Sequence, residues 1–335
     1  MAEHGEIKVV EIKKPIKISP TDQKIIQELL INSRIAASEL GKLVHLVPAS
    51  VGNHIESLIK EGIINQFLTI PNLIRSGYKI WFVLIDIPSE EEESCIKSLL
   101  KYPSTLSILK TAGKYSLIVG FTGKDISSLD KGLSIISKSV KVRDFLILPV
   151  KDMAFEPYKL FERVKNKEDN KTFEESKPLT REDKLILRIL SGNARENVVN
   201  ISKETKLPAE TIIYRLKKLK ERGIIERFFT NINIFSFGFQ GYMLMIKTLN
   251  RENQNEIFDF IKNHPRTNGQ YMLESSWNIL AVLVVKDATE LKSFIDDMQK
   301  KFSIDILSYE TIQILSQEFY DPFPKGLLNE KSGGY

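Results

Sequence analysis

The chain has 335 residues and a net charge of +5, with 42% hydrophobic and 27% charged residues. A chain of this length usually divides into two or more domains, and its apolar runs, such as Ile80 to Ile87, are far shorter than the roughly 20 residues that cross a bilayer. The single cysteine excludes an internal disulfide, and the four histidines lack metal-ligand spacing, so we expect no metal and no other cofactor.

The first 18 residues form an N-terminal extension in which Lys alternates with Glu and Ile. This extension lacks the apolar centre and the small-residue cleavage site of a secretory signal. We therefore expect a cytoplasmic protein.

The rest of the sequence contains an internal repeat. Asn32-Ser33-Arg34 recurs as Asn193-Ala194-Arg195, and Glu61-Gly62-Ile63-Ile64 recurs as Arg222-Gly223-Ile224-Ile225, each 161 positions later. A constant offset indicates two copies of one structural unit in the same order.

Residues 19–76 are predicted to form a first winged helix-turn-helix domain. Ser19 and Asp22 have the spacing of a helix N-cap and its acidic partner, and apolar residues follow at spacings of three and four. Three short helices are expected, the third over Pro48 to Lys60, and the β-rich stretch from Gln66 to Ile70 is expected to form a wing. The polar residues of the third helix are candidate DNA contacts: Ser50, Asn53 and His54.

Residues 77–161 are predicted to form a first α/β module. Gly77-Tyr78 opens its first strand, and the order strand, helix, strand, strand, helix, strand is that of the ferredoxin-like βαββαβ fold. The expected strands are Lys79 to Ile87, Thr105 to Thr111, Tyr115 to Thr122 and Val142 to Val150, and the expected helices are Glu90 to Lys101 and Ile126 to Ser139.

A highly charged segment, residues 162–178, is predicted to be a solvated linker to the second copy. Residues 179–238 are then predicted to form a second winged helix-turn-helix, in which Thr180 and Asp183 repeat the N-cap pattern and Arg227 to Asn231 the wing. Its third helix, Ala209 to Arg222, has a buried stripe of Ile212, Leu216 and Leu219.

Charge distinguishes the two helix-turn-helix domains. From Leu179 to Ser236 there are twelve basic and seven acidic residues, a net of +5, whereas Ser19 to Ser76 contains five of each. Long cationic and polar side chains suit phosphates and base edges, so the second copy is predicted to supply the main DNA contact. Its candidate DNA-binding residues are Lys203, Lys206, Thr211, Tyr214, Arg215, Lys217, Lys218 and Arg222.

Residues 239–325 are predicted to form a second ferredoxin-like module, and residues 326–335 a C-terminal tail. Gly241-Tyr242 is aligned with Gly77-Tyr78 as the opening of the first strand. The expected strands are Tyr242 to Leu249, Gly269 to Leu273, Ile279 to Lys286 and Asp305 to Leu315, and the expected helices are Asn253 to Asn263 and Ala288 to Lys301. The predicted fold class is α+β: two tandem copies of a winged helix-turn-helix followed by a ferredoxin-like domain.

The helix-turn-helix motifs carry a resemblance. Asn193-Ala194-Arg195, Leu207-Pro208 leading into Ile212-x-x-Arg215-Leu216-x-x-Leu219, and Gly223-Ile224-Ile225 together resemble the leucine-responsive regulator (Lrp/AsnC) family. The resemblance covers about Ser19 to Pro324, twice. It implies a DNA-binding regulator that dimerises through the sheets of its α/β domains, so this chain is expected to pair its two modules internally or to form a homo-oligomer.

The same resemblance implies a small-molecule effector, which in many family members is an amino acid. The family's pocket usually has Gly-x-x-Asp at the turn between the middle strands, but the corresponding turns here are Gly113-Lys114-Tyr115-Ser116 and Ser275-Ser276-Trp277-Asn278. Both lack the carboxylate that would pair with an ammonium group. Plain hairpin turns are the favoured interpretation, and Gly113, Ser116, Ser275 and Asn278 are kept as candidate effector contacts.

The sequence therefore predicts a non-enzymatic regulator that binds specific sequences of double-stranded DNA. An architectural or transcription-machinery-binding protein of the same fold is a second interpretation. A third is an enzyme resembling the sirohaem decarboxylases, which share the paired architecture. That chemistry needs a cluster of basic and histidine side chains, and His264 is the only histidine in either α/β module.

Overall fold

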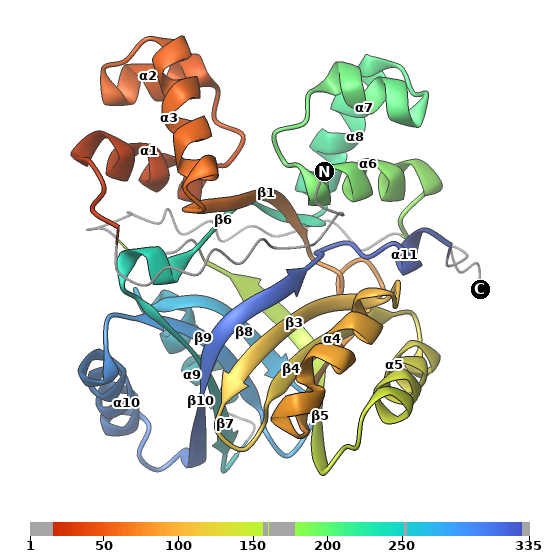
Figure 1. Ribbon diagram of the computed structural model, residues 1–335, viewed down its shortest axis with the longest axis vertical. Helices are drawn as coiled ribbons and strands as arrows, with labels where there is room; N and C mark the ends of the chain where they lie inside the picture. The colour runs from red at the N-terminus through yellow and green to blue at the C-terminus, as the bar shows by residue number, and fades with distance from the viewer. Residues whose placement is uncertain (1–15, 157–159, 161–177, 251–252, 330–335) are drawn as a thin grey trace.

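The computed structural model describes residues 16–156, 160, 178–250 and 253–329, and Figure 1 shows its arrangement. Two helical heads stand at one end of a closed β-barrel, and further helices cover the outside of the barrel. Most of the predicted N-terminal extension and linker lies outside the described residues. No helix in the described part of the chain is long and apolar enough to cross a membrane.

The first head consists of three helices: α1 (Pro20–Ile31), α2 (Ala37–Val44) and α3 (Pro48–Lys60). The Ser19 hydroxyl accepts a hydrogen bond from the Asp22 amide at 3.1 Å, which satisfies a free amide at the start of α1. Leu29, Leu40 and Val51 belong to the core that joins the helices. The helix-turn-helix predicted from residue 19 onward is therefore present.

The second head repeats this arrangement with α6 (Arg181–Gly192), α7 (Val198–Thr205) and α8 (Ala209–Glu221). At its start Thr180 and Asp183 form a complete capping box. Gly62 and Gly223 follow α3 and α8 with φ of 70° and 63°, the left-handed backbone that glycine adopts without steric cost. Residues 161 positions apart thus share the same backbone conformation at these helix ends, as well as the same sequence motif.

The two strands predicted as wings form a ribbon between the heads and the barrel. β1 (Ile64–Pro71) and β6 (Ile225–Ile232) pair with each other in an antiparallel two-stranded sheet, so each finds its partner in the other copy. Four residues at the end of each strand are buried. Burial against the opposite copy is the physical reason why the strands pair across the repeat, which the prediction of two separate wings did not include.

The α/β modules form one closed barrel of eight strands. The first contributes the order β3-β4-β2-β5 and the second the order β10-β7-β9-β8, both of them the ferredoxin-like order. β10 pairs with β3 and β5 pairs with β8, so the edge strands of each module are covered by the other. The strands are β2 (Lys79–Asp86), β3 (Thr105–Ala112), β4 (Leu117–Gly123), β5 (Asp144–Phe155), β7 (Gln240–Thr248), β8 (Thr267–Leu273), β9 (Ile279–Val285) and β10 (Ile306–Tyr320).

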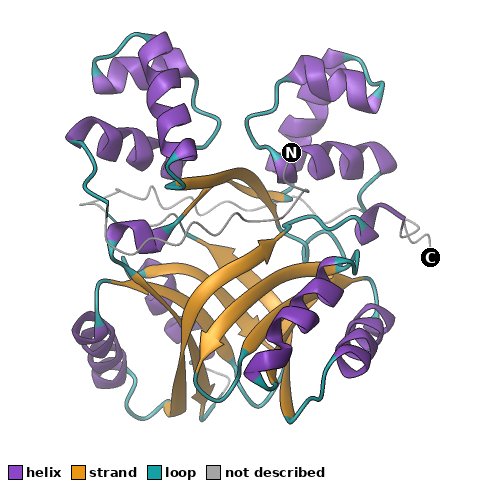
Figure 2. Ribbon diagram, viewed as in Figure 1, coloured by secondary structure: helices purple, strands orange, loops and turns teal. Residues whose placement is uncertain are grey.

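Helices cover the outer face of this barrel, as Figure 2 shows. The 3-10 turn η1 (Ser89–Glu91) leads into α4 (Glu92–Leu100), which packs with α5 (Ile126–Ser139) on the first half. α9 (Gln254–Asn263) and α10 (Ala288–Lys301) pack on the second half. η2 (Ile234–Phe237) connects β6 to β7, and α11 (Gly326–Asn329) ends the described chain beside α6. The predicted fold class is confirmed, with the two copies fused at their sheets.

One detail of the repeat alignment is corrected. The first strand of the second module begins at Gln240, so Gly238-Phe239, and not Gly241-Tyr242, corresponds to Gly77-Tyr78. Gly77 and Gly238 both have positive φ, 82° and 76°. The turn before each strand needs a left-handed residue, which glycine adopts without steric cost. The two glycines are 161 positions apart, so the repeat offset also holds at this turn.

Candidate nucleic-acid interface

The third helix of the second head, α8, has one buried and one exposed side. Ile212 and Leu219 are fully buried in the head, whereas Ile213 and Tyr214 are 57% and 62% exposed. The Lys217 side chain is 74% exposed. Tyr214 and Lys217 were predicted as DNA contacts and lie on this open side, while Ile213 was not predicted. An apolar group at such a position suits the methyl group of thymine.

Two lysines extend this exposed side beyond α8. Lys203 is exposed in the last turn of α7, and Lys206 is exposed in the turn between the helices. Lys206 caps α7 with a φ of 59°, and His45 occupies the equivalent position after α2 with a φ of 57°. Thr211 is half-buried in the first turn of α8. Lys203, Lys206 and Thr211 lie near the start of α8, and Lys217 and Lys218 lie in its C-terminal half, so groups suitable for phosphates occur along the helix.

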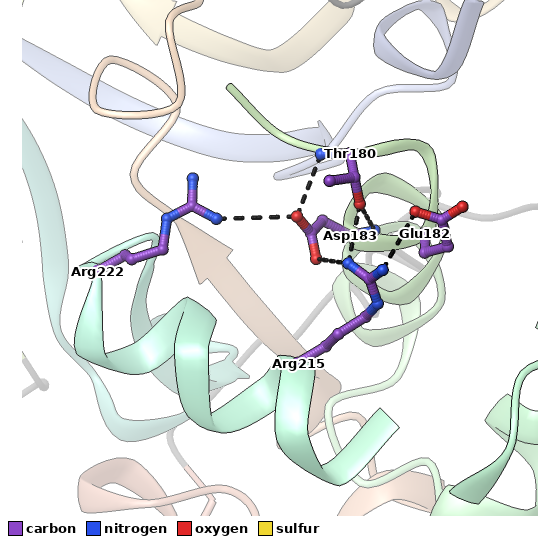
Figure 3. A network of polar contacts seen from close by, with 5 residues as sticks. All are labelled: Thr180, Glu182, Asp183, Arg215 and Arg222. Carbon is purple, nitrogen blue, oxygen red and sulfur yellow. Dashed lines mark hydrogen bonds and ion pairs between the residues drawn. The ribbon is translucent and has the colours of Figure 1, made fainter. Parts of the chain in front are cut away.

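Arg215 and Arg222, also predicted as DNA contacts, are engaged inside the head, as Figure 3 shows. Arg215 donates from Nη1 to Thr180 Oγ1 at 2.9 Å and to Asp183 Oδ1 at 3.0 Å, and its Nη2 lies 3.4 Å from Glu182 Oε2. Arg222 Nη1 lies 3.8 Å from Asp183 Oδ2. Both guanidinium groups therefore hold α8 against the N-terminus of α6.

The last two predicted lysine contacts share an acidic neighbour. Lys218 Nζ lies 2.9 Å from one carboxylate oxygen of Glu221, and Lys217 Nζ lies 3.8 Å from the other. The hydrogen bond from Lys218 lowers the pKa of the Glu221 carboxyl. Exposed ion pairs of this kind contribute little, so a phosphate can compete for either lysine.

The third helix of the first head, α3, differs in its surface. Asn53 is exposed and Ser50 is half-buried, while His54 Nδ1 lies 2.7 Å from Asp22 Oδ1. His54 and Asp22 stand at the positions of Arg215 and Asp183, so the contact between the third helix and the N-terminus of the first is repeated with a different cation. Where α8 has Lys217, α3 has Glu56.

Two arginines join the heads reciprocally. Arg34 donates to the carbonyl oxygens of Ala194 and Glu196 in the second head, and Arg195 donates to the Ser33 carbonyl oxygen in the first at 2.6 Å. The guanidinium of Arg34 stacks 5.4 Å from the Phe228 ring, and that of Arg195 stacks 5.3 Å from the Phe67 ring.

These arginines belong to the Asn-x-Arg motif that revealed the repeat, but their role was not predicted. Burial and the neighbouring Arg195 lower the pKa of Arg34. The two groups still act as donors, because a guanidinium remains protonated in proteins. The reciprocal bridge, with the β1–β6 ribbon beneath it, fixes the separation of the heads.

The second head has additional polar contacts with the segment that follows β10. Lys184 donates to the Leu327 carbonyl oxygen at 2.9 Å, and Arg188 donates to Asp321 Oδ2 at 2.5 Å and to the Phe323 carbonyl oxygen at 2.6 Å. The equivalent positions in the first head are Gln23 and Gln27. Two cations of α6 thus fasten the second head to the end of the chain.

The candidate effector residues lie in turns whose side chains are tied to the backbone. Ser116 Oγ donates to the Ile87 carbonyl oxygen at 2.9 Å, and Ser275 Oγ donates to the Trp277 carbonyl oxygen at 2.8 Å. Asn278 Oδ1 accepts from the Thr248 amide at 2.7 Å. Gly113 has a φ of 123°. The Ser275 contact lies within its own turn, whereas those of Ser116 and Asn278 join each turn to the end of a neighbouring strand, and none of the four residues lines the cavity described below.

His264 caps α9 and packs against Phe294, with ring centroids 4.5 Å apart. Its Nδ1 accepts a hydrogen bond from the Arg266 amide at 3.2 Å. Among the described residues, no group of three or more His, Cys, Asp or Glu side chains is arranged to hold a metal ion.

Comparison with known proteins agrees with this geometry. A family model described as winged helix-turn-helix DNA-binding matches residues 18–65 and again residues 180–226. An uncharacterized HTH-type transcriptional regulator of Pyrococcus horikoshii is 30% identical over 126 residues, which are 36% of this chain and 81% of that relative. One copy of the repeat thus corresponds to most of a separate protein.

Two solved structures complete the comparison. The siroheme decarboxylase NirDL is 16% identical, with a TM-score of 0.59, and the similarity covers 90% of this chain and 96% of that one. An AsnC family transcriptional regulator from Agrobacterium tumefaciens is 22% identical, with a TM-score of 0.37, over 43% of this chain and 94% of that one.

Proposed function

The chain belongs to the leucine-responsive regulator (Lrp/AsnC) family of winged helix-turn-helix transcription regulators, and we propose that it regulates transcription by binding a specific sequence of double-stranded DNA. The observation that carries the proposal is the placement of both heads at the same end of the barrel. Their separation is fixed by Arg34 and Arg195. Two DNA-reading helices at a fixed separation match two half-sites on one duplex.

In this proposal α8 supplies most of the affinity. Lys203, Lys206, Lys217 and Lys218 neutralise phosphates, and Tyr214 and Thr211 reach base edges or the backbone as α8 enters the major groove. Arg215 and Arg222 act mainly as positioning residues, because their contacts with Asp183 fix the orientation of α8.

The first head adds a second, weaker contact through Ser50 and Asn53. His54 positions α3 through Asp22, as Arg215 does for α8. Because the two heads are linked, binding of one raises the effective concentration of the other at its half-site, so moderate individual affinities suffice. A regulator of this kind works where the chromosome is, which supports the cytoplasmic location expected from the sequence.

A second candidate, decarboxylation of siroheme, is favoured only by the fold shared with NirDL over 90% of this chain. We propose a non-enzymatic protein instead. The residues that line the cavity between the barrel and the ribbon carry no charged side chain, whereas a tetrapyrrole with several carboxylates needs cationic partners. A direct check is the absorption spectrum of siroheme incubated anaerobically with the protein: an unchanged spectrum supports this choice, and formation of a decarboxylated product would overturn it.

DNA binding is tested with the full chain by fluorescence anisotropy. The labelled duplex comes from the region upstream of its own gene, and a scrambled duplex of the same composition is the control, both measured across a salt series. We expect tighter binding to the upstream duplex and an affinity that falls steeply with salt. Equal, salt-sensitive affinities would favour the architectural interpretation, and no binding at low salt would refute the proposal.

A further inference from the structure

The barrel and the β1–β6 ribbon line a partly open cavity of about 400 Å³ that the DNA-binding role does not use. Its lining residues come from the barrel strands, from β1 and β6 and from η2, and Figure 1 shows these elements below the heads. Phe82, Met243, Tyr271 and Val282 line it from the barrel, and Phe229 and Asn231 line it from β6. Its size falls within the range of small-molecule sites, about 300–1,000 Å³.

The lining determines what this cavity can hold. It is mostly aliphatic and aromatic, its polar side chains are serine, asparagine, glutamine and tyrosine, and no charged group is among the residues that line it. Asn231 Nδ2 donates to Gln317 Oε1 at 3.2 Å, so two neutral amides meet at the wall. A charged ligand would lose its hydration without gaining a counter-charge there, whereas a carbonyl, hydroxyl or amide group can bond to these side chains.

We propose that the cavity is a binding site for a neutral, mainly apolar small molecule that carries one or two uncharged hydrogen-bonding groups. Leu315 lines the cavity and is 51% exposed, so it marks where the cavity reaches the surface. The site is separate from the turns that hold Gly113, Ser116, Ser275 and Asn278. An effect of this ligand on DNA binding rests on the proposed function, whereas binding of the ligand to the cavity does not.

β6 connects this site to both heads. The strand begins four residues after the end of α8. Phe229 and Asn231 face the cavity, while Thr230 between them donates to the Leu29 carbonyl oxygen of α1 at 2.6 Å. Phe228 lies under the guanidinium of Arg34. A ligand against β6 therefore contacts the strand whose opposite side holds the first head. Ligand binding in the cavity then changes the affinity for DNA with two correctly spaced half-sites.

The test uses two fluorescent probes with the same skeleton and different charge. N-phenyl-1-naphthylamine is neutral, and 8-anilinonaphthalene-1-sulfonate adds one negative charge. We expect the neutral probe to bind the full-length protein saturably, one per chain, and about tenfold or more tightly than the sulfonate. Val282→Trp fills the cavity and should abolish this binding, whereas Thr311→Trp, at an exposed site on β10 outside the lining, should leave it unchanged.

Circular dichroism establishes whether Val282→Trp is folded. If this variant does not fold, the comparison of the two probes on the unmodified protein still tests the proposal. Absence of saturable binding, equal affinity for both probes, or binding that survives in folded Val282→Trp would each overturn the proposal. DNA anisotropy without probe reports the proposed function separately. Saturating neutral probe should then shift the affinity for the upstream duplex at least about threefold in the unmodified protein and leave it constant in Val282→Trp.

Discussion

The two heads share one fold and differ in chemistry. Position by position, Lys203, Lys206, Lys217 and Lys218 of the second head correspond to Lys42, His45, Glu56 and Ser57 of the first. The second head is also held to the segment after β10 by Lys184 and Arg188, at positions where the first head has glutamines. The added positive charges therefore serve two purposes, an exposed set suited to phosphates and a buried set that fixes the head.

This difference shows that a repeated unit keeps its geometry more strictly than its charges. The contact between the third helix and the start of the first helix occurs in both heads, as His54 with Asp22 and as Arg215 with Asp183. In the second head Arg222 joins the same carboxylate. The second contact is the more buried one, since the Asp183 side chain is 6% exposed and that of Asp22 is 20% exposed.

The largest expected effect separates these two contacts. Asp183→Ala removes the capping box and the buried carboxylate that Arg215 and Arg222 share, which we expect to cost about 3–5 kcal/mol of unfolding free energy. Asp22→Ala removes the carboxylate that accepts from the exposed Ser19 hydroxyl and contacts His54, but it keeps the Ser19 cap, and it should cost about 1 kcal/mol. Urea unfolding monitored by circular dichroism measures both, and equal losses would mean that the two heads are held alike.

The next prediction concerns the lysines proposed to neutralise phosphates. Replacing Lys203, Lys206 and Lys217 with Ala should reduce the slope of log K against log salt by roughly 0.9 for each phosphate that is no longer neutralised, about 2.7 in all. Lys42→Ala in the first head is the matched control and should reduce it by about 0.9 at most. Anisotropy titrations across the salt series measure these slopes.

A charge exchange on α3 tests whether the first head also lies on DNA. Glu56→Lys gives α3 the residue that α8 has at the equivalent position, so it should steepen the salt dependence by about 0.9 if the first head lies on the duplex. An unchanged slope in Glu56→Lys, together with the full reduction in the triple lysine variant, would place only the second head on DNA.

How much of this was predictable depends on whether the information is local. α5 and α10 match their predicted bounds, Ile126 to Ser139 and Ala288 to Lys301, because apolar periodicity and an aspartate N-cap define them within one segment. The pairing of β1 with β6 was not predictable in this way. A strand's alternation shows that it needs a partner, but it does not identify a partner 161 residues away.

The candidate site shows the same limit. The sequence identifies cations on α8, but Arg215 and Lys217 are two positions apart, and only the orientation of α6 decides which one meets a carboxylate. The Asn-x-Arg motif was visible as a repeat, whereas its hydrogen bonds cross to the other head. The cavity has no sequence signature, since its lining comes from both modules and both ribbon strands.

The reciprocal arginines give a smaller expected effect. Arg34→Ala or Arg195→Ala removes a partly buried guanidinium from backbone carbonyl oxygens and should each cost about 1.5–3 kcal/mol in urea unfolding. Because both arginines join the same two heads, the double variant should lose less unfolding free energy than the sum of the two single losses. The double variant should also lose less DNA affinity than the unmodified protein when about five base pairs are inserted between the half-sites. This insertion is half a helical turn, so it rotates one half-site to the opposite face of the duplex. Strict additivity with unchanged spacing preference would show that the bridge does not set the separation.

The smallest effect concerns Glu226 in β6, where the first copy has the neutral Asn65. Burial raises the pKa of the Glu226 carboxyl, and the Asn72 amide, donating at 3.3 Å, only partly opposes this. A raised folded-state pKa means that the protonated form is favoured on folding, so its stability is fully present below the unfolded pKa and is lost as pH rises through the folded pKa. Glu226→Gln keeps an oxygen for Asn72 without the charge, and should flatten this decline and be slightly more stable than the unmodified protein near neutral pH. Urea unfolding from about pH 4 to about pH 8 measures the difference, and a variant that loses stability at neutral pH would show that pairing of Glu226 with Arg227 outweighs the cost of burial.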